Sequence, residues 1–152
     1  MVTVMATGTF DILHMGHIYF LKEAKKLGDT LVVVVACDKT VRRLKHEPVT
    51  PEQMRLNLIK ELRMVDGAVI GSEDDMFAVV EQIQPDVIAL GYDQIHDEKS
   101  LQKKLDDRGL SARLVRLPKY DRTSDLDGTR RIIAKIIEAY GFQRQMEKIE
   151  QE

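Results

Sequence analysis

One string of residues near the start of the chain could bind phosphate: Gly8-Thr9-Phe10-Asp11-Ile12-Leu13-His14-Met15-Gly16-His17. It follows an apolar run and precedes a helical pattern, so its loop would lead into the first turn of a helix. Backbone N–H groups and the dipole at such a turn attract anions. Imidazole N–H groups can add hydrogen bonds that strengthen as negative charge develops in a transition state. His14 and His17 are therefore candidate phosphate ligands; two histidines that cap the helix or lie on the surface are the alternative.

Four other charged residues are candidates for the same chemistry. The basic stretch Lys39–Lys45 ends in Lys45, which could act as a movable point charge against a triphosphate. Arg55 falls in a predicted helix, while Asp93 and Arg122 follow predicted strands. Each has an ordinary alternative, because charged side chains most often face solvent and an aspartate can simply begin a turn or cap a helix.

The composition excludes several classes of protein. The chain has 152 residues, enough for one domain with its own core. Its 23 basic and 25 acidic residues leave a net charge of −2, so no overall attraction to nucleic acid is expected. We see no secretory signal and no apolar run near the roughly 18 residues of a membrane span, so we expect a cytoplasmic protein without membrane partners. The single cysteine, Cys37, fits a reducing compartment and is expected to be buried.

Short apolar runs alternate with longer helical patterns along the chain. Consecutive apolar positions are typical of strands that are covered on both faces, as in a parallel sheet. The expected strands are Val2–Ala6, Thr30–Ala36, Ala68–Ile70, Val87–Leu90 and Ala112–Leu117. This order predicts an α/β fold: a single-domain, doubly wound (Rossmann-like), five-stranded parallel sheet flanked by helices. We expect the domain to span residues 1–142 and the polar residues 143–152 to form a C-terminal tail.

Ligands of such sheets bind beyond the carboxyl ends of the strands, at a switch point in the strand order. Four loops are expected there: Thr7–Gly16, Asp38–Thr50, Gly91–Asp97 and Pro118–Thr129. Two helix ends also carry local predictions. Gly28 suits a left-handed cap that closes the first helix, and Thr50 with Gln53 matches a capping box that begins the helix containing Arg55.

The string Gly8-Thr9-Phe10-Asp11, followed by His14-x-Gly16-His17, resembles the signature of the cytidylyltransferase-like nucleotidyltransferases. Further matches cover nearly the whole chain: Arg55, Arg63-Met64-Val65-Asp66, Gly91-Tyr92-Asp93 and Arg122-Thr123. The resemblance implies four catalytic residues: His14, His17, Lys45 and Arg122. It implies a nucleotide site made of Gly8, Thr9, Phe10, Asp11, His14, Met15, Gly16, His17, Gly91, Asp93, Tyr120, Arg122, Thr123 and Thr129. One departure is Asp127-Gly128 in place of a Ser/Thr pair before the last helix, which makes phosphate contacts there less secure.

Within this superfamily, Gly91-Tyr92-Asp93-Gln94, Lys119-Tyr120-Asp121 and Ala6-Thr7-Gly8-Thr9 resemble archaeal FAD synthases. That resemblance implies transfer of AMP from ATP to FMN by direct in-line attack, with release of pyrophosphate. It also implies a divalent cation (Mg²⁺ or Co²⁺) on the phosphates and a homodimer. Tyr120 could stack on the adenine or pack in the core.

Two other functions stay open. One is a cytidylyltransferase that uses CTP and glycerol 3-phosphate or another small phosphate. The other is a nucleotide-binding module without turnover, which the departure at Asp127-Gly128 allows. The sequence identifies neither the metal ligands nor the residues that would bind FMN.

Overall fold

The computed structural model describes residues 1–121, 126 and 128–151. Its elements are β1 (Thr3–Gly8), α1 (Met15–Lys25), β2 (Thr30–Val35), α2 (Asp38–Leu44), α3 (Glu52–Lys60), β3 (Gly67–Ile70), α4 (Met76–Ile83), β4 (Val87–Leu90), α5 (Glu98–Asp107), β5 (Arg113–Arg116) and α6 (Thr129–Glu150). The strands form one five-stranded parallel sheet in the order β3-β2-β1-β4-β5. The predicted doubly wound α/β fold is confirmed.

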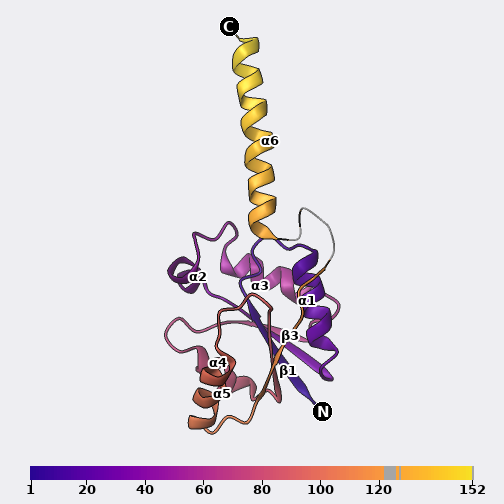
Figure 1. The fold of residues 1–152 in the computed structure, drawn as a ribbon, viewed down its shortest axis with the longest axis vertical. Coiled ribbons are helices and arrows are strands. Elements are labelled where there is room, and N and C mark those ends of the chain that lie inside the picture. Colours follow the sequence, from indigo (N-terminus) through magenta and orange to yellow (C-terminus); the bar gives the residue numbers. More distant parts are fainter. Residues whose placement is uncertain (122–125, 127, 152) are drawn as a thin grey trace.

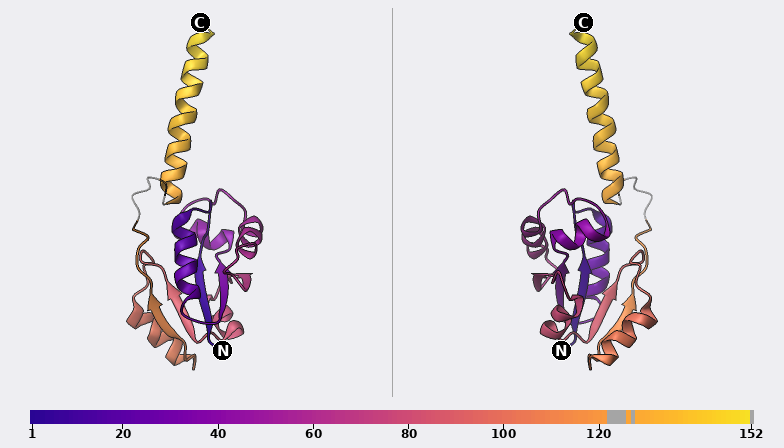
Figure 2. Two further views of the ribbon diagram at one scale, coloured as in Figure 1. Left: turned by 90° about the vertical axis from the view of Figure 1, so that its right-hand side faces the viewer. Right: turned by 90° about the vertical axis from the view of Figure 1, so that its left-hand side faces the viewer.

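Helices cover both faces of the sheet (Figure 1 and Figure 2). On one face, α1 and α3 pack on the sheet through Leu21, Ala24, Leu56 and Ile59. On the other face, α4 and α5 do so through Phe77, Val80, Leu101 and Leu105. Successive strand residues point to opposite faces, so both faces need apolar side chains. This is why the central strands read as unbroken apolar runs.

The glycine after α1 has a different role from the one predicted. The helix is capped by Lys26 in the right-handed region, and Gly28 does not adopt a positive φ. A Cβ atom at Gly28 would instead lie 2.6 Å from the carbonyl oxygen of Val2. The prediction of a left-handed cap is therefore wrong, and Gly28 is small because the start of β1 passes close against it.

Two predictions between β2 and α3 are also wrong. Residues 38–44 form the helix α2, so only the second part of the expected loop Asp38–Thr50 is irregular. Pro51, not Thr50, occupies the N-cap position of α3, and it has no side-chain capping bond. The hydroxyl of Thr50 is used elsewhere, because it donates a hydrogen bond to Asp11 at 2.6 Å.

The last helix, α6, projects beyond the sheet toward the C-terminus (Figure 1 and Figure 2). It is 22 residues long and none of its residues is buried. It runs past residue 142 without a break, and the division into residues 1–142 and a tail at 143–152 stays a prediction. None of the helices in the described part of the chain is both long and apolar enough to cross a membrane.

Candidate active site

The candidate site lies where the strand order reverses. From β1, the sheet continues on one side to β2 and β3 and on the other to β4 and β5. The carboxyl ends of β1 and β4 border this switch point, which is where open parallel sheets bind ligands. The hydroxyl of Thr129, the first residue of α6, donates a hydrogen bond to the carbonyl oxygen of Asp11 at 2.6 Å. The N-terminus of α6 is thus held against the loop that follows β1.

The backbone of the loop after β1 is strained. Phe10 and Ile12 adopt φ values of 55° and 53°, a left-handed region that residues other than glycine rarely occupy. The ring of Phe10 is 3% exposed and folds back over Gly8, where a Cβ atom would lie 2.8 Å from its Cζ atom. The same ring meets His17 edge-on, with centroids 5.4 Å apart. Gly8 and Phe10 therefore support His17 from within the protein.

The two histidines begin α1 as a reciprocal cap. His14 is the N-cap residue, and its Nδ1 accepts a hydrogen bond from the backbone N–H of Gly16 at 3.0 Å. The Nδ1 of His17 accepts one from the backbone N–H of His14 at 3.4 Å. A ring whose Nδ1 accepts in this way carries its proton on Nε2. The cap therefore makes the Nε2–H group of each ring a hydrogen-bond donor. Met15, the first helical residue, is 52% exposed.

The environment of His17 keeps its ring neutral. Burial, with smaller contributions from the neighbouring His14 and Lys45, lowers the pKa of His17 to about 3, although Asp11 acts in the opposite direction. At neutral pH the imidazole is therefore uncharged, and it cannot serve as a general acid in the form of an imidazolium. What it can offer a phosphate is a neutral, fixed N–H donor.

Asp11 ties the loop after β1 to the segment before α3. It is 3% exposed, and its carboxylate accepts hydrogen bonds from the backbone N–H groups of Val49 (2.7 Å) and Thr50 (2.9 Å) and from the Thr50 hydroxyl (2.6 Å). Burial alone would raise the pKa of Asp11, but these bonds and the charge of Arg55 outweigh it and hold the pKa below its usual value. Asp11 is therefore ionised and occupied by protein donors.

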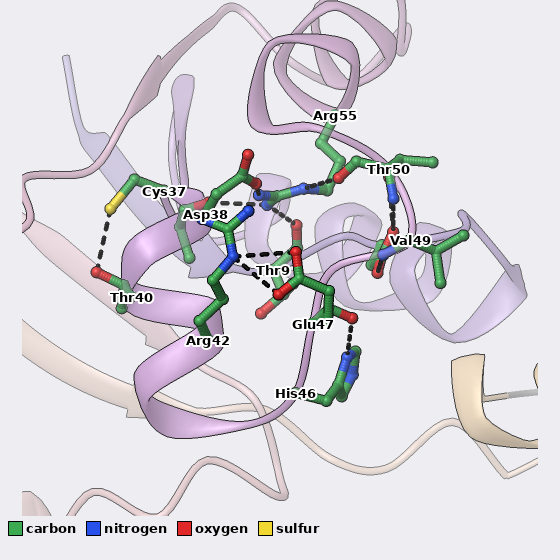
Figure 3. A network of polar contacts seen from close by, with 12 residues as sticks. Thr9, Cys37, Asp38, Thr40, Arg42, His46, Glu47, Val49, Thr50 and Arg55 are labelled. Atoms are coloured by element: carbon green, nitrogen blue, oxygen red, sulfur yellow. Dashed lines mark hydrogen bonds and ion pairs between the residues drawn. The ribbon is translucent and has the colours of Figure 1, made fainter.

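Arg55 is fully buried, which rules out the alternative that it is a solvated surface residue. From α3 it donates hydrogen bonds to the carbonyl oxygens of Thr50 (3.0 Å), Thr9 (2.8 Å) and Ala36 (2.8 Å) and to the carboxylate of Asp38 (2.6 Å). Figure 3 shows Arg55 among Thr9, Asp38 and Thr50. These acceptors belong to the ends of β1 and β2, the start of α2 and the segment before α3. One side chain thus joins the segments that surround the site.

The basic stretch after β2 contains two cations in ion pairs and the predicted phosphate ligand Lys45. Lys39 forms an ion pair with Glu73 (2.7 Å) and Arg42 with Glu47 (2.9 Å); both pairs are exposed and add little stability. Lys45 is exposed and follows directly after α2. Its charge is one of the causes that lower the pKa of His17, so its ammonium group lies within electrostatic reach of that ring. The predicted role of Lys45 beside the histidines stays a prediction.

The loop after β4 carries Gly91 and Asp93 to the same end of the sheet. Gln94 donates to the carbonyl oxygen of Thr7 at 2.9 Å, and its side-chain oxygen accepts from the N–H of Gly91 at 3.2 Å. Arg116 donates to the carbonyl oxygens of Gly91 (2.8 Å) and Gln94 (3.0 Å). These bonds hold the loop against β1 and leave the side chain of Asp93 exposed.

Of the remaining predicted residues, Tyr120 follows β5 and Thr129 begins α6. Tyr120 is partly buried and its ring lies beside that of Tyr19, with centroids 5.3 Å apart. This contact with α1 is compatible with both predicted roles of the Tyr120 ring, stacking on the adenine and packing in the core. Arg122 and Thr123 lie outside the residues that the structure describes, so their roles stay predictions from the family pattern.

Sequence reasoning missed the residues that hold the site together. Thr50 was expected only as a helix cap and Asp38 only as the start of a loop, because their actual partners lie far away in the chain. Arg116 could have been found, since it is an arginine in a strand that was expected to be apolar. It is part of β5 and lies only partly exposed, bonded to three backbone carbonyls and Glu98.

The fold and the cap define a class of protein. A strained loop, a pair of capping histidines and two helix N-termini meet at the switch point of a parallel sheet. The sequence profile of the cytidylyltransferase-like family matches residues 5–134, and the chain belongs to that family.

The chain is also similar to individual relatives over most of its length. The chain is 56% identical over 138 residues to the FAD synthase of Aciduliprofundum boonei, covering 91% of this chain and 92% of the relative. It is 51% identical over 141 residues to the FAD synthase of Thermoplasma acidophilum, covering 93% and 98%.

Solved structures resemble the fold as well. The lipopolysaccharide core biosynthesis protein from Thermoplasma volcanium is 55% identical, with a TM-score of 0.79 over 80% of this chain and 99% of that one. The pantoate-beta-alanine ligase from Francisella tularensis is 15% identical, with a TM-score of 0.57 over 82% of this chain and 61% of that one. The second likeness concerns the fold alone.

Proposed function

We propose that this chain is an FAD synthase, which transfers AMP from ATP to FMN. A phosphate oxygen of FMN attacks the α-phosphorus of ATP in line, the bond from that phosphorus to the bridging oxygen breaks, and pyrophosphate leaves. The observation that carries the proposal is the cap at the start of α1, which makes the Nε2–H groups of His14 and His17 fixed donors. The names of the relatives, at about half identity over nearly the whole chain, support ATP and FMN as the substrates.

Each residue has a role that follows from its chemistry. The transfer needs positioning and charge neutralisation more than a protein nucleophile. The Nε2–H groups of His14 and His17 donate to the phosphate oxygens as their charge grows. Lys45 neutralises the departing pyrophosphate as a mobile point charge. Arg122 adds a second cation from the segment before α6, on the family pattern alone.

The divalent cation is part of the proposal, too. Within the described residues, no group of three or more His, Cys, Asp or Glu side chains is arranged to hold a metal ion. This fits a Mg²⁺ or Co²⁺ ion that is held mainly by the ATP phosphates and water, as Mg²⁺ commonly is at nucleotide sites. When bound, it would neutralise phosphate charge.

A matrix of substrates tests the function. The protein is incubated with ATP or CTP, with FMN or glycerol 3-phosphate, and with Mg²⁺ or Co²⁺; pyrophosphate and the nucleotide product are quantified by chromatography. We expect FAD and an equal amount of pyrophosphate only from ATP with FMN. Product only with CTP would reject the proposal in favour of a cytidylyltransferase. ATP binding without pyrophosphate in any pairing would indicate a binding module.

A homodimer belongs to the same proposal. The helix α6 supports it, because large apolar side chains such as Ile137, Tyr140 and Phe142 are 64–66% exposed on it. Exposed apolar surface of this kind is often covered by another protein surface. Sedimentation equilibrium tests the assembly: a single species of twice the chain mass is expected, and a monomer at all concentrations would reject it.

A further inference from the structure

We propose that Asp11, Thr50 and Arg55, together called the clasp, are positioning residues that fix the segment after Lys45 to the loop that carries His14 and His17. The inference rests on the proposed transfer of AMP and deepens it. Nothing in the reaction requires these three side chains to touch ATP or FMN. Their contribution is to fix the chain around Lys45 relative to the histidines, which are the groups that the proposed transfer uses.

The loop that carries the histidines cannot hold its shape alone. Its backbone places Phe10 and Ile12 in the left-handed region, and strained residues of this kind persist only where their surroundings over-determine them. The clasp supplies that restraint. Arg55 donates to the carbonyl oxygen of Thr9 (2.8 Å), directly before Phe10, and Asp11 lies between the two strained residues with three protein donors on its carboxylate.

The segment that follows Lys45 depends on the same bonds. Residues 46–50 belong to no helix or strand, so their path is set by side-chain contacts. Asp11 accepts hydrogen bonds from the N–H of Val49 and from both the N–H and the hydroxyl of Thr50. Arg55 donates to the carbonyl oxygen of Thr50 from the other side. The end of the segment is therefore fixed to the loop that leads to the histidines.

Burial shows that the clasp acts through other residues. Arg55 is 0% and Asp11 is 3% exposed, and both are bonded to protein groups. Asp11 precedes His14 by three residues and Thr50 follows Lys45 by five. A loosened clasp would thus shift Lys45 against the histidines, and a shift of about 1 Å can lower a rate about a hundredfold.

A double-mutant cycle tests this inference. Thr50→Val removes the hydroxyl bond to Asp11 with little change in shape, and Lys45→Ala removes the group that the clasp is proposed to position. We expect Thr50→Val to lower kcat about tenfold in the wild-type background and less than about twofold in Lys45→Ala, because contacting groups couple whereas independent sites add. Thr50→Ser keeps the hydroxyl and should restore most of the activity. Thr40→Val is the matched control, since the Thr40 hydroxyl contacts Cys37 instead (3.1 Å).

The outcomes separate this inference from the proposed function. Equal losses from Thr50→Val in both backgrounds, with Lys45→Ala itself impaired, would overturn the clasp. The dissociation constant of ATP, measured by calorimetry for the same four proteins, gives a second cycle that needs no turnover. Coupling in ATP binding without any FAD formation would keep the clasp and reject the FMN adenylyltransferase. FAD formation with additive effects in both cycles would support the FMN adenylyltransferase and reject the clasp.

Discussion

The backbone N–H of His14 donates to Nδ1 of His17, and the two rings stack with their centroids 3.8 Å apart. Helix capping and phosphate binding are therefore not alternatives for these histidines. Each ring uses Nδ1 for the cap, and that use fixes the proton on Nε2. The helix cap, which was the alternative to phosphate binding, therefore makes the Nε2–H group of each ring available as a hydrogen-bond donor.

Replacement of His17 by asparagine should separate the two uses of the ring. The asparagine oxygen takes the place of Nδ1 and can keep the cap, but the Nε2–H donor is lost. We expect kcat for FAD formation to fall by about a hundredfold or more, as for other donors to a transition state. Steady-state assays with ATP and FMN measure the effect. His17→Gln keeps an N–H near the position of Nε2 and serves as the matched comparison.

A different pattern would contradict this reading of His17. If His17→Asn and His17→Gln lost activity equally and both unfolded at lower temperature, the ring would act through the cap alone. Thermal melts of both variants are therefore measured beside the rates. The expected result is a nearly unchanged melting temperature for His17→Asn with a much lower kcat.

His17 should also make the protein sensitive to mild acid. Its pKa of about 3 lies below the ordinary value of 6.5, so the native state disfavours the protonated ring. The unfolded chain takes up this proton near pH 6.5, and the stabilisation that is present above that pH is lost as the pH falls toward 3. Asp11 contributes only at lower pH, because its pKa is held below the usual 3.8.

Urea denaturation between pH 7.5 and 4.5 checks this dependence. The free energy of unfolding of the wild type should fall more steeply with decreasing pH than that of His17→Asn, whose side chain does not titrate. Parallel curves for the two proteins would show that the ring is not kept neutral by the fold. His46 and His96 are present in both proteins and cancel in the comparison.

The two histidines could be identified from the sequence because the residues that form the cap are neighbours in the chain. His14, Gly16 and His17 lie within one helical turn, so residue type and spacing determine the local geometry. The doubly wound parallel sheet followed from alternating strands and helices in the same way. The bond from Thr50 to Asp11 spans 39 residues and leaves no trace in either local pattern.

The burial of charged side chains is the second feature that the sequence could not predict. Arginine is rarely buried without a partner, so its average behaviour predicts exposure for Arg55 and Arg116. Both instead lie among backbone carbonyls whose positions only the folded sheet defines. The residue type alone could not distinguish a solvated charge from one that organises four segments.

Removal of the Arg116 guanidinium should weaken nucleotide binding. The carbonyl oxygens of Gly91, Gln94 and His96 would lose their donor, so the loop that carries Asp93 would no longer be held beside β1. Hydrogen bonds to a charged group are worth about 1.5–3 kcal/mol, so we expect Arg116→Met to raise the KM for ATP about tenfold. The exposed arginine at the start of the same strand gives the control Arg113→Met. An unchanged KM for ATP in Arg116→Met would contradict a role of this loop in binding.

Replacement of Arg55 should destabilise the protein more than replacement of its partner Asp38. Arg55→Met leaves Asp38 without its ion pair and three backbone carbonyls without their donor, and loss of one partner of a buried pair destabilises by about 3–5 kcal/mol. Asp38→Asn should be milder, because the side chain of Asp38 is 18% exposed and Arg55 keeps its carbonyl acceptors. Urea denaturation of both variants gives the two free energies of unfolding. A larger loss in Asp38→Asn than in Arg55→Met would mean that the ion pair, and not the contacts to the carbonyls, carries the stabilisation.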